Sequence, residues 1–305
     1  MNPLDVIEIA GRHLSGLSGH VFDILSISKP VSPAAAVNLT KVISKLSPLL
    51  ANLIEFNLIE LLNDCEEFDG FGEWVRQDPG FPDAVFLGKI HPAPGLEIKA
   101  WFPLATEITA RFKESQNHLS DGNTYVVLLA WIPEYVVYGK PKILNVSMIE
   151  GGSVAHARDV HYHNPPDYLV IEPEDTRTRT RNLRQTNTNG YKWQGTSEEF
   201  REAQEAVARW GENGRVYQPT PAYQRLLRQL LSRYPYRLDT NFAKVDRIVH
   251  PEIEHFKLDV QQTRYQGMTI QEWSAIYNSR DDKRIAHALE TKLTITEADA
   301  DRLVK

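Results

Sequence analysis

The sequence predicts an α/β protein in which a central mixed β-sheet is flanked by helices. A long apolar pattern at helical spacing covers residues 34–64, and an amphipathic helical pattern covers residues 103–119. Short runs rich in β-forming residues are typical of strands and occur at 81–90, 96–102, 124–132 and 141–149. Because helical and strand patterns alternate, we expect N-terminal helices, a sheet, and further loops and helices after it.

Composition agrees with an ordinary globular protein. The 305 residues include 42% hydrophobic and 24% charged residues, and the formal net charge is −6. This charge argues against attraction to polyanions over the whole surface, so any such contact needs a local basic patch. Cys65 is the only cysteine, which excludes an intramolecular disulfide and favours a reducing cytoplasm. No apolar run appears long enough to cross a bilayer, and we expect no membrane partner.

We expect one domain, residues 1–305, built from three stretches: a helical region at 1–78, a core at 79–150, and an elaboration at 151–305. Pro48 predicts a break between two helices, and the Gly151–Gly152 pair predicts a turn. Further on, the patterns predict a strand at 168–171 and helices at 197–210, at 221–234 and around Trp273.

The most informative stretch is a predicted β-hairpin. Its two strands flank a loop at residues 91–95 that contains two prolines and a glycine. Side chains alternate along a strand, so Glu97 and Lys99 share one face while Ile98 points to the other. Asp83 opens the first strand. The hairpin therefore brings two acids and a lysine to one edge of the sheet.

This combination suits metal-dependent phosphodiester hydrolysis. Asp83 and Glu97 are oxygen ligands for a hard divalent ion such as Mg²⁺, and the backbone carbonyl of Ile98 is a natural further ligand. Lys99 could orient or deprotonate the attacking water, or stabilise negative charge that develops on the phosphorus centre. The sequence does not choose between these roles.

Pro82-Asp83, thirteen intervening residues and Glu97-Ile98-Lys99 resemble the PD-(D/E)xK motif of restriction-endonuclease-like nucleases. The resemblance covers about residues 80–150 and implies a restriction-endonuclease-like core with 79–150 as its catalytic part. It implies a type II restriction endonuclease that uses one or two Mg²⁺ ions, with Mn²⁺ as a substitute. In that family the two acids bind the metal and the lysine assists the water, and we expect these roles for Asp83, Glu97 and Lys99.

Such an enzyme hydrolyses double-stranded DNA at a short, palindromic site and leaves 5′-phosphate and 3′-hydroxyl ends. One active site per chain must cut two antiparallel strands, so we expect a homodimer whose two-fold axis matches the palindrome. The resemblance also implies a cognate DNA methyltransferase in the same system, without direct contact, and a cytoplasmic location in a bacterium or archaeon.

A basic, amide-rich segment at residues 176–195 is the predicted DNA-reading element. Arginine suits guanine, asparagine and glutamine suit adenine, and the segment lacks acidic residues. The candidate DNA contacts are Arg177, Arg179, Arg181, Arg184, Gln185, Asn187, Asn189 and Lys192. A solvated surface loop would have a similar composition. We expect Tyr191 and Trp193 to anchor the segment to the body of the protein.

Three residues are possible accessories to the site. Glu60 lies near the end of the first long helical pattern, and Glu107 and Gln116 lie on the pattern that follows the hairpin. His156, His161 and His163 are more typical of a polar loop than of a metal site. Two other functions remain open, a repair or recombination nuclease of the same fold and a non-catalytic DNA-binding protein.

Overall fold

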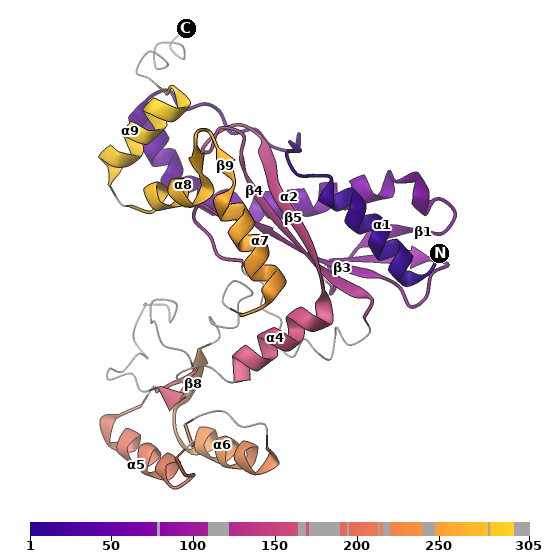
Figure 1. The fold of residues 1–305 in the computed structure, drawn as a ribbon. Helices are drawn as coiled ribbons and strands as arrows, with labels where there is room; N and C mark the ends of the chain where they lie inside the picture. The colour runs from indigo at the N-terminus through magenta and orange to yellow at the C-terminus, as the bar shows by residue number, and fades with distance from the viewer. Residues whose placement is uncertain are drawn as a thin grey trace. The chain divides into compact units, whose positions relative to one another are not determined.

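The computed structural model describes most of the chain, and its helices and strands are drawn in Figure 1. The described residues are 1–77, 80–108, 122–163, 169–170, 190–193, 195–212, 214–215, 220–239, 248–279 and 281–295.

The chain forms two compact units. Unit 1 comprises Met1–Ala110, Asn117–Val154 and His250–Lys305, and unit 2 comprises Arg111–Gln116 and Ala155–Val249. The expected elaboration at 151–305 is therefore shared between the two units, and its last part returns to the unit that contains the hairpin. The expectation of a single domain stays a prediction.

A five-stranded mixed sheet organises unit 1 and confirms the predicted α/β class. Its spatial order follows the chain: β1 (Gly72–Arg76), β2 (Ala84–Gly88), β3 (Gly95–Trp101), β4 (Thr124–Pro133) and β5 (Pro141–Glu150). All neighbouring strands are antiparallel except β3 and β4, which run parallel. Parallel neighbours require a crossover connection, which residues 102–123 provide.

The sheet is covered on both faces at β4. Every residue from Val126 to Ile132 is completely buried, as the continuous apolar run predicts for a central strand. At the other end of the sheet, Phe68, Trp74 and Phe86 form an aromatic cluster with ring centroids 5.2–6.3 Å apart. This cluster fixes β1 and β2 to the end of the preceding helix.

Two N-terminal helices precede the sheet, α1 (Pro3–Ser15) and α2 (Pro33–Asn63). Helix α1 packs against β5, and α2 packs against β1 and β3. The prediction of a break at Pro48 is wrong, because α2 continues through it. A proline inside a helix costs about 3 kcal/mol, but the buried apolar stripe of α2 continues on both sides of Pro48 and offsets that cost.

Helix α2 is also long and apolar enough to cross a bilayer, which the sequence analysis overlooked. Core helices of soluble proteins share this property, and one face of α2 is buried against the sheet. A 3₁₀ turn, η1 (Glu66–Phe68), connects its end to β1.

The C-terminal part of unit 1 consists of α7 (Pro251–Gln262), the short hairpin β9 (Arg264–Tyr265) and β10 (Met268–Thr269), α8 (Ile270–Tyr277) and α9 (Asp282–Leu293). Helix α7 packs on β5 and α9 on α2. The helix expected around Trp273 is confirmed as α8. Helices α7 and α9 carry apolar stripes too, but the sequence analysis did not identify them.

Two local predictions are wrong. Gly151 and Gly152 do not form a turn but begin α4 (Gly151–His163), because Glu150 accepts hydrogen bonds from the backbone N–H groups of Gly152 and Ser153. The helix expected at 103–119 does not begin as predicted, because residues 103–105 form a turn and residues 106–108 belong to neither a helix nor a strand, and residues 109–119 lie outside the described part.

Unit 2 has a small core of its own. A three-stranded sheet of β6 (Leu169–Val170), β7 (Gly190–Trp193) and β8 (Tyr236–Asp239) accompanies α5 (Ser197–Ala208) and α6 (Pro221–Arg233). Thr196 caps α5 and Thr220 caps α6. The core residues are Trp193, Ala203, Val207, Tyr223, Leu227, Leu230 and Tyr234.

Candidate active site

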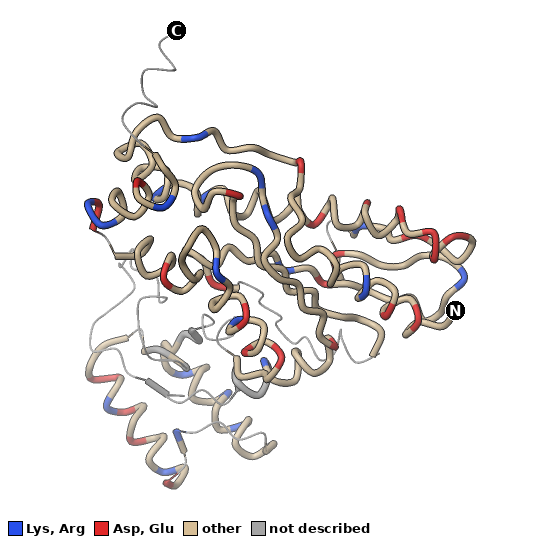
Figure 2. The backbone as a smooth tube through the Cα atoms, turned by 45° about the horizontal axis from the view of Figure 1, so that its top comes forward, with Lys and Arg blue, Asp and Glu red and all other residues tan. Residues whose placement is uncertain are grey.

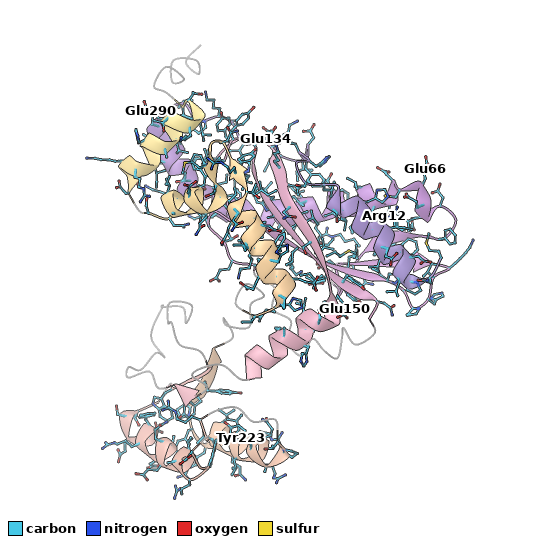
Figure 3. The ribbon with its side chains drawn as sticks, viewed as in Figure 1. Arg12, Glu66, Glu134, Glu150, Tyr223 and Glu290 are labelled. Carbon is cyan, nitrogen blue, oxygen red and sulfur yellow. The ribbon has the colours of Figure 1, made fainter. Side chains whose placement is uncertain are left out.

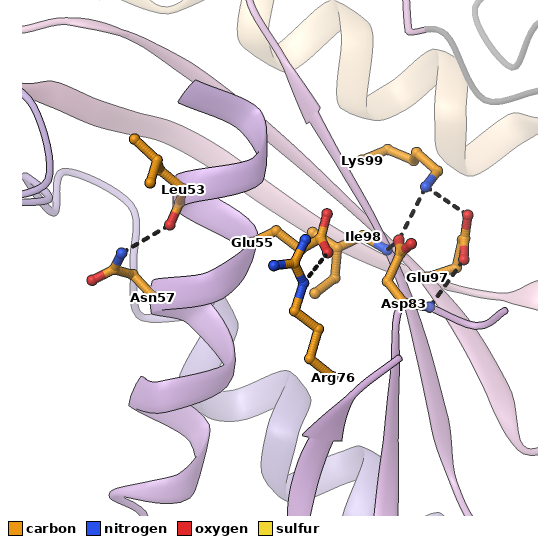
Figure 4. A network of polar contacts seen from close by, with 8 residues as sticks. All are labelled: Leu53, Glu55, Asn57, Arg76, Asp83, Glu97, Ile98 and Lys99. Atoms are coloured by element: carbon orange, nitrogen blue, oxygen red, sulfur yellow. Dashed lines mark hydrogen bonds and ion pairs between the residues drawn. The ribbon is translucent and has the colours of Figure 1, made fainter. Parts of the chain in front are cut away.

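The hairpin brings Asp83, Glu97 and Lys99 together, as the sequence predicts. Asp83 directly precedes β2, and Glu97 and Lys99 lie two residues apart on β3. Ala84 pairs with Leu96 and Val85 with Gly95, so the two strands separate just where Asp83 and Glu97 face each other. Figure 4 shows the three functional side chains joined in one network.

Four contacts hold this network. The ammonium group of Lys99 lies 3.0 Å from Asp83 Oδ2 and 2.5 Å from Glu97 Oε1. The backbone N–H of Asp83 donates to Glu97 Oε2 at 3.2 Å, and that of Ile98 donates to Asp83 Oδ2 at 2.7 Å. Each carboxylate is thus positioned by the backbone of the opposite strand as well as by the lysine.

The backbone of Ile98 occupies the edge of β3 that Asp83 faces. The N–H and C=O groups of one strand residue point to the same edge, and the Ile98 N–H already points to Asp83. The carbonyl of Ile98 is therefore directed to the same side as the Asp83 carboxylate. This is the position expected of a further oxygen ligand.

A third acid, Glu55 of α2, lies beside this network (Figure 4). It accepts a hydrogen bond from the guanidinium of Arg76 at 3.1 Å, and its side chain is only 14% exposed. Burial raises the pKa of Glu55, the negative charge of Asp83 raises it further, and Arg76 opposes both effects. The pKa of Glu55 therefore depends on the charge of Asp83.

Burial strongly affects the two functional groups of β3. Burial raises the pKa of Glu97 to about 7, and Asp83 adds to the increase while Lys99 opposes it. Burial lowers the pKa of Lys99, but the negative charges of Glu97 and Asp83 outweigh burial and raise this pKa above its usual value. At neutral pH, Lys99 is thus charged and Glu97 is near the midpoint of its titration.

The site holds three carboxylates and two cationic side chains, Lys99 and Arg76. Asp83, Glu97 and Glu55 converge from three segments, and the repulsion from Asp83 raises the pKa of both glutamates. Carboxylate and backbone oxygens are the ligands that a hard divalent cation prefers. Such a cation would relieve the repulsion, so the residues present fit a Mg²⁺ or Mn²⁺ site.

The structure describes two of the three residues that were expected as accessories to the site. Glu60 is exposed on α2, Glu107 is half-buried in the chain after β3, and Gln116 lies outside the described residues. Glu55 was not among the acids expected at the site. Glu55 has a recognisable signal, because it directly follows buried Ile54 and precedes buried Leu58 by three residues, at the margin of the apolar stripe.

Most of the expected DNA contacts cannot be placed. Arg177, Arg179, Arg181, Arg184, Gln185, Asn187 and Asn189 lie outside the described residues. Lys192 lies in β7, where its backbone pairs with Val170 and Arg237. The anchoring role expected of Trp193 is confirmed, because its side chain is 2% exposed within the core of unit 2 and donates to the carbonyl of Thr196.

The three histidines at 156, 161 and 163 were expected in a polar loop, but the structure places them in a helix. His156 lies on α4, and the backbone of His161 and His163 continues that helix. His156 is exposed, and the described residues show no metal-binding cluster around it.

No protein-family model, curated protein or solved structure matches the chain.

Proposed function

We propose that the chain is a magnesium-dependent type II restriction endonuclease with a restriction-endonuclease-like core. It hydrolyses phosphodiester bonds of double-stranded DNA at a short specific site and leaves 5′-phosphate and 3′-hydroxyl ends. The observation that carries the proposal is the convergence of Asp83, Glu97 and Lys99 at the point where β2 and β3 separate. The mixed sheet, with β3 and β4 parallel, is compatible with this core.

The metal would be held by the carboxylates of Asp83 and Glu97 and the carbonyl of Ile98, with Glu55 close enough to adjust the charge. When bound, Mg²⁺ lowers the pKa of a coordinated water and neutralises charge on a phosphate oxygen. The chain itself contributes the positions of the ligands. Both carboxylates are already oriented by backbone N–H groups, so little rearrangement is needed.

The charge state of Lys99 favours one of its possible roles. In the metal-free protein the carboxylates of Glu97 and Asp83 raise the pKa of Lys99, which favours the charged ammonium over a neutral amine that could accept a proton from the attacking water. A fixed positive charge can orient that water and stabilise negative charge on the phosphorus centre. We therefore assign Lys99 to charge stabilisation and water orientation.

DNA recognition would come from the basic segment at 176–195, which leads into β7. Trp193, near the end of this segment, is buried in the core of unit 2, so this end has a fixed position in that unit. A homodimer would place two such sites on the two strands of a palindrome, and a companion methyltransferase would protect the host DNA.

The decisive experiment is cleavage of bacteriophage DNA by the full-length chain, with Mg²⁺, with Mn²⁺ and with EDTA. Discrete fragments that require the metal support the proposal. A smear supports the alternative of a repair or recombination nuclease, and intact DNA with both metals supports a non-catalytic DNA-binding protein. Asp83→Asn is the matched control: it should lose cleavage, and cleavage by that preparation at the wild-type rate would mean that the site at Asp83 does not cut the DNA.

A further inference from the structure

A second group of metal-binding side chains lies in unit 1, in segments other than those that carry the candidate active site. His13 is in the last turn of α1, and Cys65 and Glu67 follow the end of α2. One donor atom from each of the three side chains lies within 4.8 Å of the others. Figure 3 labels Arg12 and Glu66, the sequence neighbours of two of these residues, on the adjacent segments.

We propose that His13, Cys65 and Glu67 form a binding site for a divalent transition metal of the zinc class. The metal would join the end of α1 to the segment between α2 and β1.

The donor set determines the class of metal. Thiolate sulfur and imidazole nitrogen are ligands of Zn²⁺ and similar ions, whereas Mg²⁺ and Ca²⁺ require oxygen. At tetrahedral Zn²⁺, bonds of about 2.0–2.3 Å place neighbouring ligand atoms about 3.3–3.8 Å apart. The Nε2 atom of His13 lies 3.1 and 3.2 Å from the two carboxylate oxygens of Glu67, close to this spacing, and Cys65 Sγ lies within 4.8 Å of the other two donors, so it would move closer when the metal binds.

The backbone that carries the donors is well fixed. Phe68, next to Glu67, is 2% exposed and packs against Trp74 and Phe86. Asn63, just before Cys65, exchanges two hydrogen bonds with the backbone of Trp74, at 2.7 and 2.9 Å. The metal would therefore bind donors that are largely organised before it arrives.

Charge around the group favours a cation. Asp64, Glu66, Glu67 and Asp69 lie within six residues, and Figure 2 shows acidic positions along this part of unit 1. Burial raises the pKa of the Cys65 thiol, and the negative charges of Glu67 and Asp64 raise it further, so the thiol proton opposes binding and the metal must displace it. Arg12 approaches Glu67 to 3.9 Å, but its side chain is 69% exposed and can move away.

Metal binding releases one proton from the cluster. Cys65 releases its thiol proton to solvent, and the Cys65 contact to the Leu61 carbonyl, at 3.5 Å, is given up. His13 binds as the neutral ring, with Nε2 on the metal and the proton on Nδ1. The side chains of His13 and Glu67 are 34% and 42% exposed, so solvent can supply a fourth ligand.

Cobalt titration of the full-length chain, produced without a histidine tag and treated with EDTA, tests this proposal. A cobalt–thiolate complex absorbs in the near ultraviolet, and Cys65 is the only cysteine, so this band reports one residue. We expect one Co²⁺ per chain, displacement by Zn²⁺, and no displacement by an excess of Mg²⁺. An absent band, or a band that Mg²⁺ removes, would overturn the proposal.

The variants separate this site from other Co²⁺ sites. His13→Gln and Glu67→Gln change partly exposed side chains and should each weaken Co²⁺ binding at least about tenfold. Glu66→Gln, a neighbouring exposed acid, is the matched control and should weaken binding much less than either ligand variant, because Glu66 contributes charge but no donor atom. Asp83→Asn should also keep the band, which distinguishes failure of this proposal from failure of the nuclease proposal. Unchanged affinity in both His13→Gln and Glu67→Gln would refute the three-ligand site.

Discussion

The two side-chain clusters of unit 1 each place a carboxylate beside a nitrogen-bearing side chain, but they differ in donor chemistry and in burial. The cluster at β2 and β3 has carboxylate and backbone oxygens with an ammonium group between them. The cluster at the end of α1 has a carboxylate, an imidazole and a thiol. Carboxylates alone therefore do not indicate which metal a site binds, because the accompanying atoms decide it.

The two clusters also differ in how deeply their carboxylates are buried. Glu97 is 8% exposed and its pKa is raised to about 7, whereas Glu67 is 42% exposed and its pKa is lowered, mainly by its own backbone N–H and by His13. The buried acid resists ionisation until a cation arrives. The exposed acid is ionised in any case, so its loss should matter only when a metal is bound.

Replacing Lys99 by alanine should have the largest effect. The change removes the positive charge that contacts both carboxylates, so the cleavage rate should fall at least about a hundredfold while DNA binding persists. Cleavage assays and gel-shift titrations with the same DNA fragment measure the two properties. Glu66→Gln should cut at the wild-type rate, and a Lys99→Ala enzyme that also cuts at that rate would remove Lys99 from the mechanism.

Glu97 should make the metal-free protein less stable as pH rises. Its folded-state pKa is raised, so between about pH 4.5 and pH 7 the folded chain holds a proton that the unfolded chain has lost. The resulting stability is present below about pH 4.5 and is lost as pH passes 7. The loss amounts to at most about 3 kcal/mol in the free energy of unfolding.

Urea unfolding in EDTA at pH 5 and pH 7.5 checks this sign, with Glu97→Gln as the comparison. The amide cannot ionise, so the variant should match the wild type at pH 5 and exceed its stability at pH 7.5. Mg²⁺ needs the ionised carboxylate, so its affinity for the wild type should fall about tenfold per pH unit below pH 7. A wild type that gains stability relative to the variant as pH rises would contradict the burial argument.

The number of residues between the members of a cluster determines whether the cluster could be predicted from the sequence. Asp83 and Glu97 are joined by a local hairpin, and strand alternation puts Lys99 on the same face, so all three could be identified without a structure. His13 and Glu67 are 54 residues apart, and they meet only because α1 packs near the end of α2. No local pattern records that packing.

In the fold, too, local patterns were predicted and the effects of long-range packing were not. The buried run of β4, the hairpin and the mixed sheet follow from short-range patterns, and they were predicted correctly. The break predicted at Pro48 does not occur. Proline disfavours a helix locally, but the apolar residues on both sides of Pro48 are buried by tertiary packing, and this burial stabilises α2 along its whole length. Gly151 was misjudged because the side chain of Glu150 satisfies the first N–H groups of α4, which replaces the turn that two glycines favour.

Glu55→Gln should have an intermediate effect, because Glu55 lies beside the site without contacting Lys99. Loss of one negative charge near Asp83 should weaken the attraction for Mg²⁺ and raise the Mg²⁺ concentration needed for half-maximal cleavage by about tenfold. Glu60→Gln, on the same helix but exposed, is the matched control. Equal effects of the two variants would mean that the acidic end of α2 acts only through its total charge.

Glu67→Gln should have the smallest effect in the absence of metal. The contact of Glu67 with His13 is exposed to solvent, and exposed polar contacts of this kind contribute little to stability. In EDTA, the urea midpoints of the variant and the wild type should therefore coincide. In Zn²⁺, the wild-type midpoint should increase with the metal concentration and the variant's should lag behind, because only a bound metal makes the carboxylate matter. If the variant is destabilised equally in EDTA and in Zn²⁺, then the carboxylate contributes through packing, and the contrast between an exposed and a buried acid disappears.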